Sequence, residues 1–132
     1  MRFIWLVALL LSASAQAYTG HELREDCQAA DEFFAKKKTT DPYQSVKSAR
    51  CLSYVAGFVD GYSVSDYLAD KVGVKLNAIC LPNDPDLSMR LVRAVVIHVE
   101  RVPPNTTVST ATLVAGALTK AFPCTDSLES KK

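Results

Sequence analysis

The chain has 132 residues, of which 48% are hydrophobic and 22% charged, and its formal net charge is +1. A chain of this length forms one small domain more readily than two. Because nucleic-acid binding requires a basic surface, the nearly neutral charge argues against nucleic acid as the partner.

Residues 1–17, MRFIWLVALLLSASAQA, have the pattern of a secretory signal peptide: one basic residue, an apolar run over 3–11, and a small-residue end. The apolar run is shorter than the ~20 residues that a membrane-spanning helix needs, and no later segment is suited to span a membrane. We therefore expect cleavage after Ala17. The exported domain, residues 18–132, is then expected to have no attachment to the membrane. Its tail, from about residue 125, is polar and predicted to be frayed.

The first predicted helix runs from about Gly20 to Lys38. Thr19 and Glu22 have the spacing of a capping box, in which each side chain hydrogen-bonds the backbone of the other residue. Apolar residues follow at helical spacing, and they are Leu23, Cys27, Ala30 and Phe34. Three lysines at the end of the segment suit the negative end of the helix dipole.

The second predicted helix begins at Asp41-Pro42, a capping residue followed by proline, and continues to about Leu68. Its apolar stripe contains Cys51, Val55, Phe58 and Tyr62. The stretch CLSYVAGFVDGY also places Ser53, Gly57 and Gly61 along a neighbouring face. A glycine inside a helix costs roughly 0.5–1 kcal/mol relative to alanine.

We expect a second helix to pack closely against this glycine strip, because that packing would offset the cost of the glycines. The candidate helix-packing residues are Tyr54, Gly57, Asp60 and Gly61. The alternative is that Gly61 only ends the helix.

Residues 70–82 show no helical period and are predicted to form a connection with an extended piece at 72–76. The third predicted helix opens at Asp84-Pro85 and ends before Pro103-Pro104. Its apolar residues cover much of its circumference, so we expect it to be central to the core or buried against a second copy of the chain in a homodimer. These residues are Leu87, Leu91, Val92, Val95, Val96, Val99 and Val102, with His98 on the same face.

The fourth predicted helix begins near Asn105 and is stopped by Pro123. Its apolar face consists of Val108, Ala111, Ala115, Leu118 and Phe122. The predicted fold is therefore all-α: a compact bundle of about four helices, arranged as two αα-hairpins.

Four cysteines in an exported domain are expected to form two disulfides. If the first two helices form an antiparallel hairpin, Cys27 and Cys51 lie at nearly the same distance from its turn and face each other. In the second hairpin, Cys80 precedes the first helix and Cys124 follows the last, so these two ends also meet. We predict the pairs Cys27–Cys51 and Cys80–Cys124, each stabilising the fold by about 3–4 kcal/mol.

The residues that could support catalysis do not form a recognisable site. The two histidines, His21 and His98, have no metal-binding spacing, and a histidine on an apolar face is more often a hydrogen-bonded core residue. No cysteine remains as a nucleophile once both disulfides form, and no nucleophile elbow or phosphate-binding loop is present. We predict a protein that is not an enzyme and needs no metal or cofactor.

Three segments, CLSYVAGFVDGY, ICLP and FPC, occur in this order behind the signal peptide. They resemble the type VI secretion amidase immunity (Tai) family from about Cys27 to Cys124. The matching positions are Cys51, Tyr54, Gly57, Asp60, Cys80, Pro82, Phe122, Pro123 and Cys124.

The resemblance implies a periplasmic, often dimeric helical protein that binds a peptidoglycan amidase effector and blocks its active site. Inhibitors of this kind commonly insert a turn into a cleft, so Arg101, Asn105 and Thr106 in the turn RVPPNTT are candidate contacts. The alternative is that this turn only joins two helices.

Two other functions are compatible with the pattern. A small helical periplasmic acid-stress chaperone would expose apolar surface when its carboxylates are protonated. A carrier of small apolar ligands would need a cavity between its helices.

Overall fold

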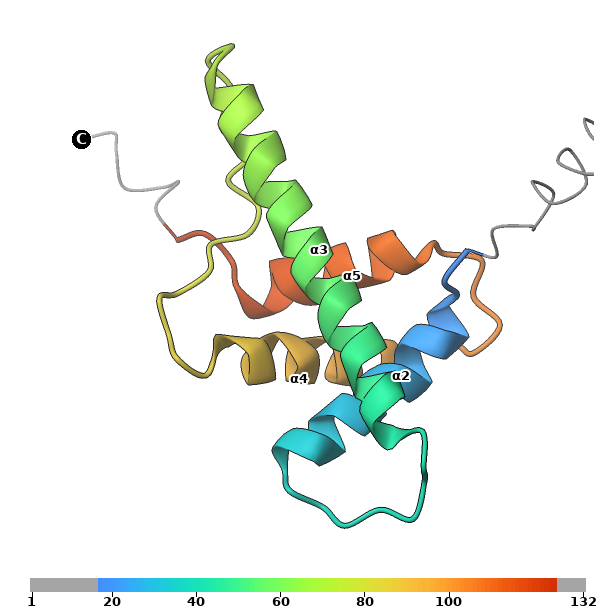
Figure 1. Ribbon diagram of the computed structural model, residues 1–132. Coiled ribbons are helices and arrows are strands. Elements are labelled where there is room, and N and C mark those ends of the chain that lie inside the picture. The colour runs from blue at the N-terminus through green and yellow to red at the C-terminus, as the bar shows by residue number, and fades with distance from the viewer. Residues whose placement is uncertain (1–16, 126–132) are drawn as a thin grey trace, which may run out of the picture.

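The computed structural model describes residues 17–125 and contains four helices over that range: α2 (Gly20–Phe34), α3 (Gln44–Asp70), α4 (Leu87–Glu100) and α5 (Thr110–Ala121). Figure 1 shows α3 as a long helix that crosses the other three and extends beyond them at one end. The predicted all-α class is confirmed. Nearly all of the predicted signal peptide and most of the predicted frayed tail lie outside the described residues.

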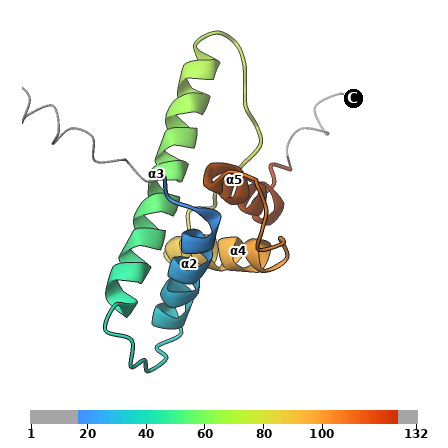
Figure 2. The same ribbon diagram turned by 90° about the vertical axis from the view of Figure 1, so that its right-hand side faces the viewer.

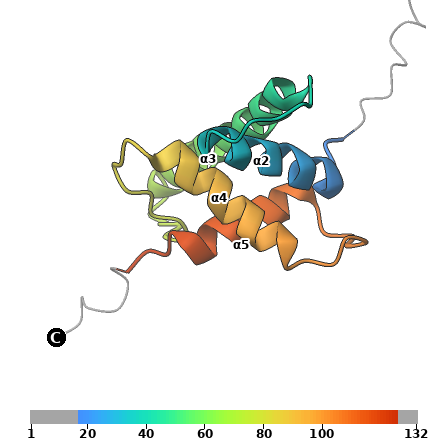
Figure 3. The same cartoon turned by 90° about the horizontal axis from the view of Figure 1, so that it is seen from below.

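The helices form two pairs. Figure 2 shows α2 beside the N-terminal half of α3, and Figure 3 shows α4 and α5 running side by side in opposite directions. This is the predicted arrangement of two αα-hairpins. None of the described helices is long and apolar enough to cross a membrane.

The helix starts follow the predicted capping signals, with two shifts. At α2, Thr19 Oγ1 accepts a hydrogen bond from the Glu22 amide at 3.2 Å, and Glu22 Oε2 accepts one from the Thr19 amide at 2.8 Å, so the capping box is confirmed. The carboxylates of Asp41 and Asp84 instead each accept a bond from the amide two residues later. Each Asp-Pro pair therefore forms a turn, and the helix begins after that turn.

Two predicted boundaries are wrong and one is confirmed. α2 ends at Phe34 and not near residue 38. α3 ends at Asp70, close to the predicted end near Leu68, so the alternative that Gly61 ends it is excluded. α5 begins at Thr110 and not near Asn105, because the Ser109 side chain caps it by accepting from the Thr112 amide at 3.2 Å. The predicted extended piece at 72–76 forms no strand in the described part of the chain.

α4 is central to the core, as predicted: it contacts the other three helices and buries five apolar side chains along its length. The largest side chains without exposed surface come from all four helices, and they are Leu23, Leu118, Val55, Val92, Val95, Val99 and Val114, together with Cys27 and Cys51. Burial of side chains of this size is the main source of stability in a domain this small.

Both predicted disulfides are present. Cys27 and Cys51 have their Cα atoms 5.0 Å apart and are fully buried, which follows from their matched positions in the α2–α3 pair. Cys80 and Cys124 are also 5.0 Å apart, and the Cys80 amide donates to the Phe122 carbonyl at 2.9 Å. The second disulfide thus fixes the start of the α4–α5 pair to its end.

The expectation that another helix of this chain packs against the glycine strip of α3 is wrong. A Cβ atom added at Gly57 or Gly61 would meet no atom within 4 Å, and Gly57, Asp60 and Gly61 are exposed. The neighbouring stripe with Cys51 and Val55 faces the core instead, and its burial turns the glycines outward. Of the four predicted packing residues, Tyr54 alone packs against the core cluster.

Candidate partner-binding surface

The most exposed apolar surface of the described chain lies at the projecting end of α3. We define the α3 tip as residues 64–76, which include the last turns of α3 and the start of the following loop. Figure 1 shows this segment standing clear of the other helices. Its large apolar side chains are 38–78% exposed, and they are Val64, Tyr67, Leu68, Val72, Val74 and Leu76.

The backbone at the α3 tip is held in a defined conformation. The amides of Val72 and Val74 both donate to the Ala69 carbonyl, at 3.0 and 2.9 Å, and Gly73 has a φ of +79°. A glycine in this left-handed conformation is the common way to end a helix. The chain therefore turns back sharply, and Val72 is exposed at the turn.

The returning loop is fastened to α3 by side-chain hydrogen bonds. Asp66 Oδ1 accepts from the Leu76 amide at 3.1 Å, and the Tyr62 hydroxyl oxygen accepts from the amides of Ala78 and Ile79 at 3.0 and 3.1 Å. A hollow of about 410 Å³ remains between helix and loop. Because the loop is already ordered, a partner that binds the tip would not have to order it.

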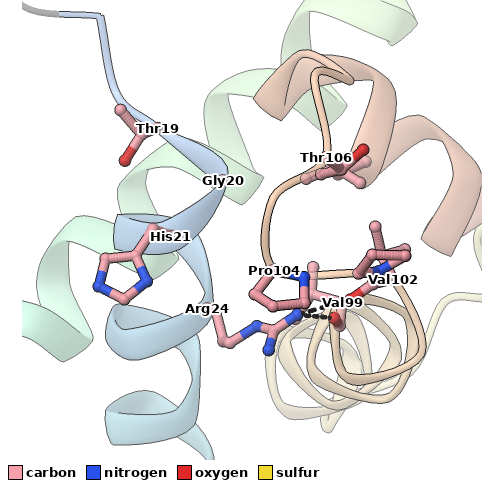
Figure 4. A pocket seen from close by; sticks show the side chains of 10 residues that line it. Thr19, Gly20, His21, Arg24, Val99, Val102, Pro104 and Thr106 are labelled. Carbon is pink, nitrogen blue, oxygen red and sulfur yellow. Dashed lines mark hydrogen bonds between the residues drawn. The ribbon is translucent and has the colours of Figure 1, made fainter.

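The turn that contains the three predicted contact residues is braced by α2. Figure 4 shows Arg24 reaching from α2 to the end of α4, where its guanidinium donates to the carbonyls of Val99 and Val102. Carbonyls at a helix end have no partner within the helix, so Arg24 caps α4. This contact closes one side of a hollow of about 180 Å³ that Thr106 also lines.

The three predicted contact residues occupy different positions around this turn. Arg101 is exposed at the C-cap of α4, and Asn105 is exposed in the turn. Thr106 is partly buried, its amide donates to the Pro103 carbonyl at 3.1 Å, and its hydroxyl accepts from the Val108 amide at 3.3 Å. Six large apolar side chains are exposed on the α3 tip and none in the turn at 101–107, so the tip offers the larger apolar surface to a partner.

A polar cluster near the start of α2 was not predicted from the sequence. The buried carboxylate of Asp26 accepts a hydrogen bond from the Tyr18 hydroxyl at 2.8 Å and lies 3.3 Å from Arg50 Nε. Arg50 also pairs with Glu22 at 3.0 Å, and its guanidinium lies over the Tyr18 ring. Burial, followed by the hydrogen bond to Asp26, raises the pKa of Tyr18 far above its ordinary value.

The two histidines lie in unlike surroundings. His21 is exposed and its Nε2 lies 3.4 Å from the Glu25 carboxylate. His98 is partly buried; the burial, with the nearby charges of Lys120 and Arg101, lowers the pKa of its imidazole. Among residues 17–125, no group of three or more histidine, cysteine, aspartate or glutamate side chains is arranged to hold a metal ion.

Comparison with family models gives a match over nearly all of the described chain. The model of the family described as Rap1a immunity proteins matches residues 19–124, which is the whole helical bundle. The chain belongs to the Rap1a immunity proteins. No curated protein and no solved structure matches the chain significantly.

Membership of the Rap1a family confirms the class of protein that the sequence resemblance implied. A Rap1a immunity protein is not an enzyme and neutralises a toxin effector, so its partner is a cognate effector protein. The family is distinct in name from Tai, and the match does not identify the effector. The two disulfides indicate an oxidising compartment outside the cytoplasm.

Proposed function

We propose that this Rap1a protein is exported to the periplasm by its signal peptide and there binds a peptidoglycan amidase effector, blocking its active site with the α3 tip. The observation that carries the proposal is the α3 tip itself, a projecting segment with six exposed apolar side chains. Contiguous exposed apolar surface on a folded protein commonly marks a contact with another protein.

The shape and order of the α3 tip support occlusion as the way it acts. An active-site cleft is concave, and the tip is a narrow end of a helix with its loop folded back. Its apolar side chains provide the kind of central anchor on which binding energy concentrates. The hydrogen bonds that Asp66 and Tyr62 accept from the loop amides already hold the loop, which reduces the entropy lost on binding.

The choice of an amidase as the effector rests on the resemblance to the Tai family. The positions shared with that family include three of the four cysteines and Tyr54, Gly57 and Asp60 on α3. Most of these residues are cysteine, glycine, aromatic or proline, which serve the scaffold, so the resemblance supports the class of effector and not the α3 tip as its contact.

A homodimer is also part of the proposal. The exposed strip at Ser53, Gly57 and Gly61 has no side chain that would keep another backbone away, and Val46 on the same helix is 54% exposed. A second copy could therefore bring its own α3 close to this face. Sedimentation equilibrium of the mature chain measures this directly, and a mass of one chain at all concentrations contradicts it.

Co-purification and a cell-wall digestion assay test the proposed function. The mature chain, residues 18–132, is mixed with each candidate peptidoglycan amidase of the same periplasm and of neighbouring bacteria. We expect one amidase to co-purify and to lose its activity in proportion to the amount of added protein. Full amidase activity in every mixture, at a molar excess of the protein, would refute the proposal.

A further inference from the structure

A hollow between α4 and α5, separate from the α3 tip, is lined by basic side chains. Its volume is about 210 Å³, and it is lined by the cations Arg101, at the end of α4, and Lys120, near the end of α5, together with the imidazole of His98. Ala94 and Ala117 line it as well, and the 45% exposed Ile97 lies at its edge. The hollow thus combines cations with an apolar wall.

The cations of this hollow lack the acidic partners that three arginines elsewhere in the described chain have. Arg50, Arg90 and Arg93 each lie within 3.3 Å of a carboxylate oxygen. Within residues 17–125, by contrast, neither Arg101 nor Lys120 forms an ion pair, and the imidazole of His98 makes no hydrogen bond. The charge of this hollow is therefore available to an outside group.

The fold fixes the position of the His98 ring at this hollow. A Cβ atom added at Gly116 would lie 2.9 Å from Nε2 and 3.2 Å from Cε1 of His98, so the ring rests directly on the backbone of α5. Any larger residue at position 116 would displace the imidazole. Gly116 therefore allows the His98 side chain to approach the backbone of α5 closely. The sequence predicts such a close approach for Gly57 and Gly61 in α3.

At neutral pH the imidazole of His98 is uncharged, because its pKa is lowered, and it can donate one hydrogen bond. Burial is the first cause of its lowered pKa, and Lys120 on α5 and Arg101 at the end of α4 are the charged groups that lower it further. A neutral imidazole has one N–H that can donate, and an anion placed beside it would draw a second proton onto the ring.

We infer that the hollow between α4 and α5 binds the carboxylate of an acidic side chain from a partner protein. Lys120 and Arg101 attract the carboxylate, His98 donates a hydrogen bond to it, and Ile97 with the alanines contacts the apolar residue next to it. An acidic side chain beside an apolar one fits both parts of the hollow. The inference rests on the proposed function only in taking the amidase effector as that partner.

A peptide titration followed by NMR tests the inference without the effector. The probe is the blocked tripeptide acetyl-Leu-Glu-Leu-amide, and its Gln analogue is the matched control at equal ionic strength. We expect the Glu peptide to shift the signals around Ile97, His98 and Lys120 and to raise the titration midpoint of His98 by about half a pH unit. His21, the other histidine of the chain, is the internal reference.

Charge-removal variants show whether the cations recognise the peptide. Arg101→Gln and Lys120→Gln each weaken binding of the Glu peptide by about two- to fivefold, as expected for a partly exposed ion pair. Lys38→Gln is the matched control, because Lys38 is exposed in the loop after α2, outside both the hollow and the α3 tip. Circular dichroism verifies that all three variants fold.

Three results would overturn the inference: no shift with the Glu peptide, an equal shift with the Gln peptide, or unchanged binding in both hollow variants. None of these involves an amidase. A failure here is therefore separate from a failure of the proposed function, which the digestion assay measures.

Discussion

The hydroxyl of Tyr18 donates a hydrogen bond of 2.8 Å to Asp26, a carboxylate with only 2% of its residue surface exposed. Tyr18 also accepts at its carbonyl a bond of 2.6 Å from the Thr110 hydroxyl, and its ring lies 4.8 Å from that of Tyr54. The first residue after the predicted cleavage site therefore connects α2, α3 and α5.

Replacing Tyr18 by phenylalanine removes the hydroxyl and leaves the buried Asp26 with Arg50 alone. We expect the free energy of unfolding to fall by about 1.5–3 kcal/mol, the usual contribution of a hydrogen bond to a charged group. Urea denaturation measures the change. Tyr43→Phe is the control, since Tyr43 is 66% exposed; an equal loss in both variants would show that the bond to Asp26 does not matter.

Alanine substitutions at two helical glycines are expected to have opposite effects. Gly57→Ala should raise stability by about 0.5–1 kcal/mol, because alanine has the higher helix propensity and its Cβ meets no atom within 4 Å. Gly116→Ala should lower stability, because its Cβ would lie 2.9 Å from His98 Nε2. Thermal unfolding measures both. A destabilised Gly57→Ala protein would reveal a close neighbour on that face, as in a homodimer.

Charges placed on the α3 tip should separate binding from folding. Leu68→Asp and Val72→Asp replace side chains that are 58% and 78% exposed, so stability should change little. If the tip anchors the effector, each variant should bind it about 30-fold more weakly, the effect of losing a central contact residue. Calorimetry with the co-purifying amidase measures this.

Phe33→Asp is the matched control for the α3 tip, because Phe33 is equally exposed, at 58%, and lies near the end of α2. It should leave effector binding unchanged. Equal binding by all three variants would exclude the tip as the anchor and direct attention to the turn at 101–107.

The stability contributed by Glu22 should depend on pH. The hydrogen bond from the Thr19 amide is the first cause that lowers the pKa of this carboxyl in the folded protein; the Thr19 hydroxyl and Arg50 also lower it. Because the folded pKa lies below the unfolded value of 4.5, the contribution is complete above that pH and is lost as pH falls through the folded value.

Glu22→Gln should therefore be less stable than the natural protein at about pH 7 and equally stable at about pH 2. Urea midpoints at both pH values measure the difference, with the exposed Glu32→Gln as control. A constant difference at the two pH values would contradict the assignment. An apolar dye added to the samples at low pH also tests for the surface exposure that an acid-stress chaperone requires.

The two disulfides should differ in their susceptibility to reduction. Cys27 and Cys51 are fully buried, whereas Cys80 is exposed at the surface. Because thiol–disulfide exchange requires access to a sulfur atom, mild reduction of the folded protein should open Cys80–Cys124 first. Alkylation and mass mapping at successive times measure the order. Simultaneous loss of both bonds would mean that reduction proceeds through global unfolding.

The disulfides and the helices could be predicted because their signals are local. Capping residues, prolines and apolar spacing act within one helix, and the pairing of Cys27 with Cys51 needs only a hairpin of two such helices. The shift of α5 to Thr110 shows the limit of this reasoning: Ser109 and Asn105 both suit a helix start, and the structure uses Ser109.

The α3 tip and the exposure of Gly57 could not be predicted, because both depend on how far one helix extends past the others. A strip of small residues permits close packing but does not supply the neighbour. The sequence predicts a helix that continues past Gly61 to about Leu68, but helical spacing does not show where the neighbouring helices end. The position of His98 on Gly116 likewise arises only when α4 and α5 pack.

The two disulfides close separate rings that follow one another along the chain, over 27–51 and 80–124. Neither ring joins the α2–α3 pair to the α4–α5 pair, whose covalent link is the single polypeptide that passes through the α3 tip. One proteolytic cut in the loop after α3 would convert the protein into a heterodimer of two peptides, held by the shared core alone. Whether the two peptides stay associated would then depend on protein concentration, whereas the folding of the intact chain does not.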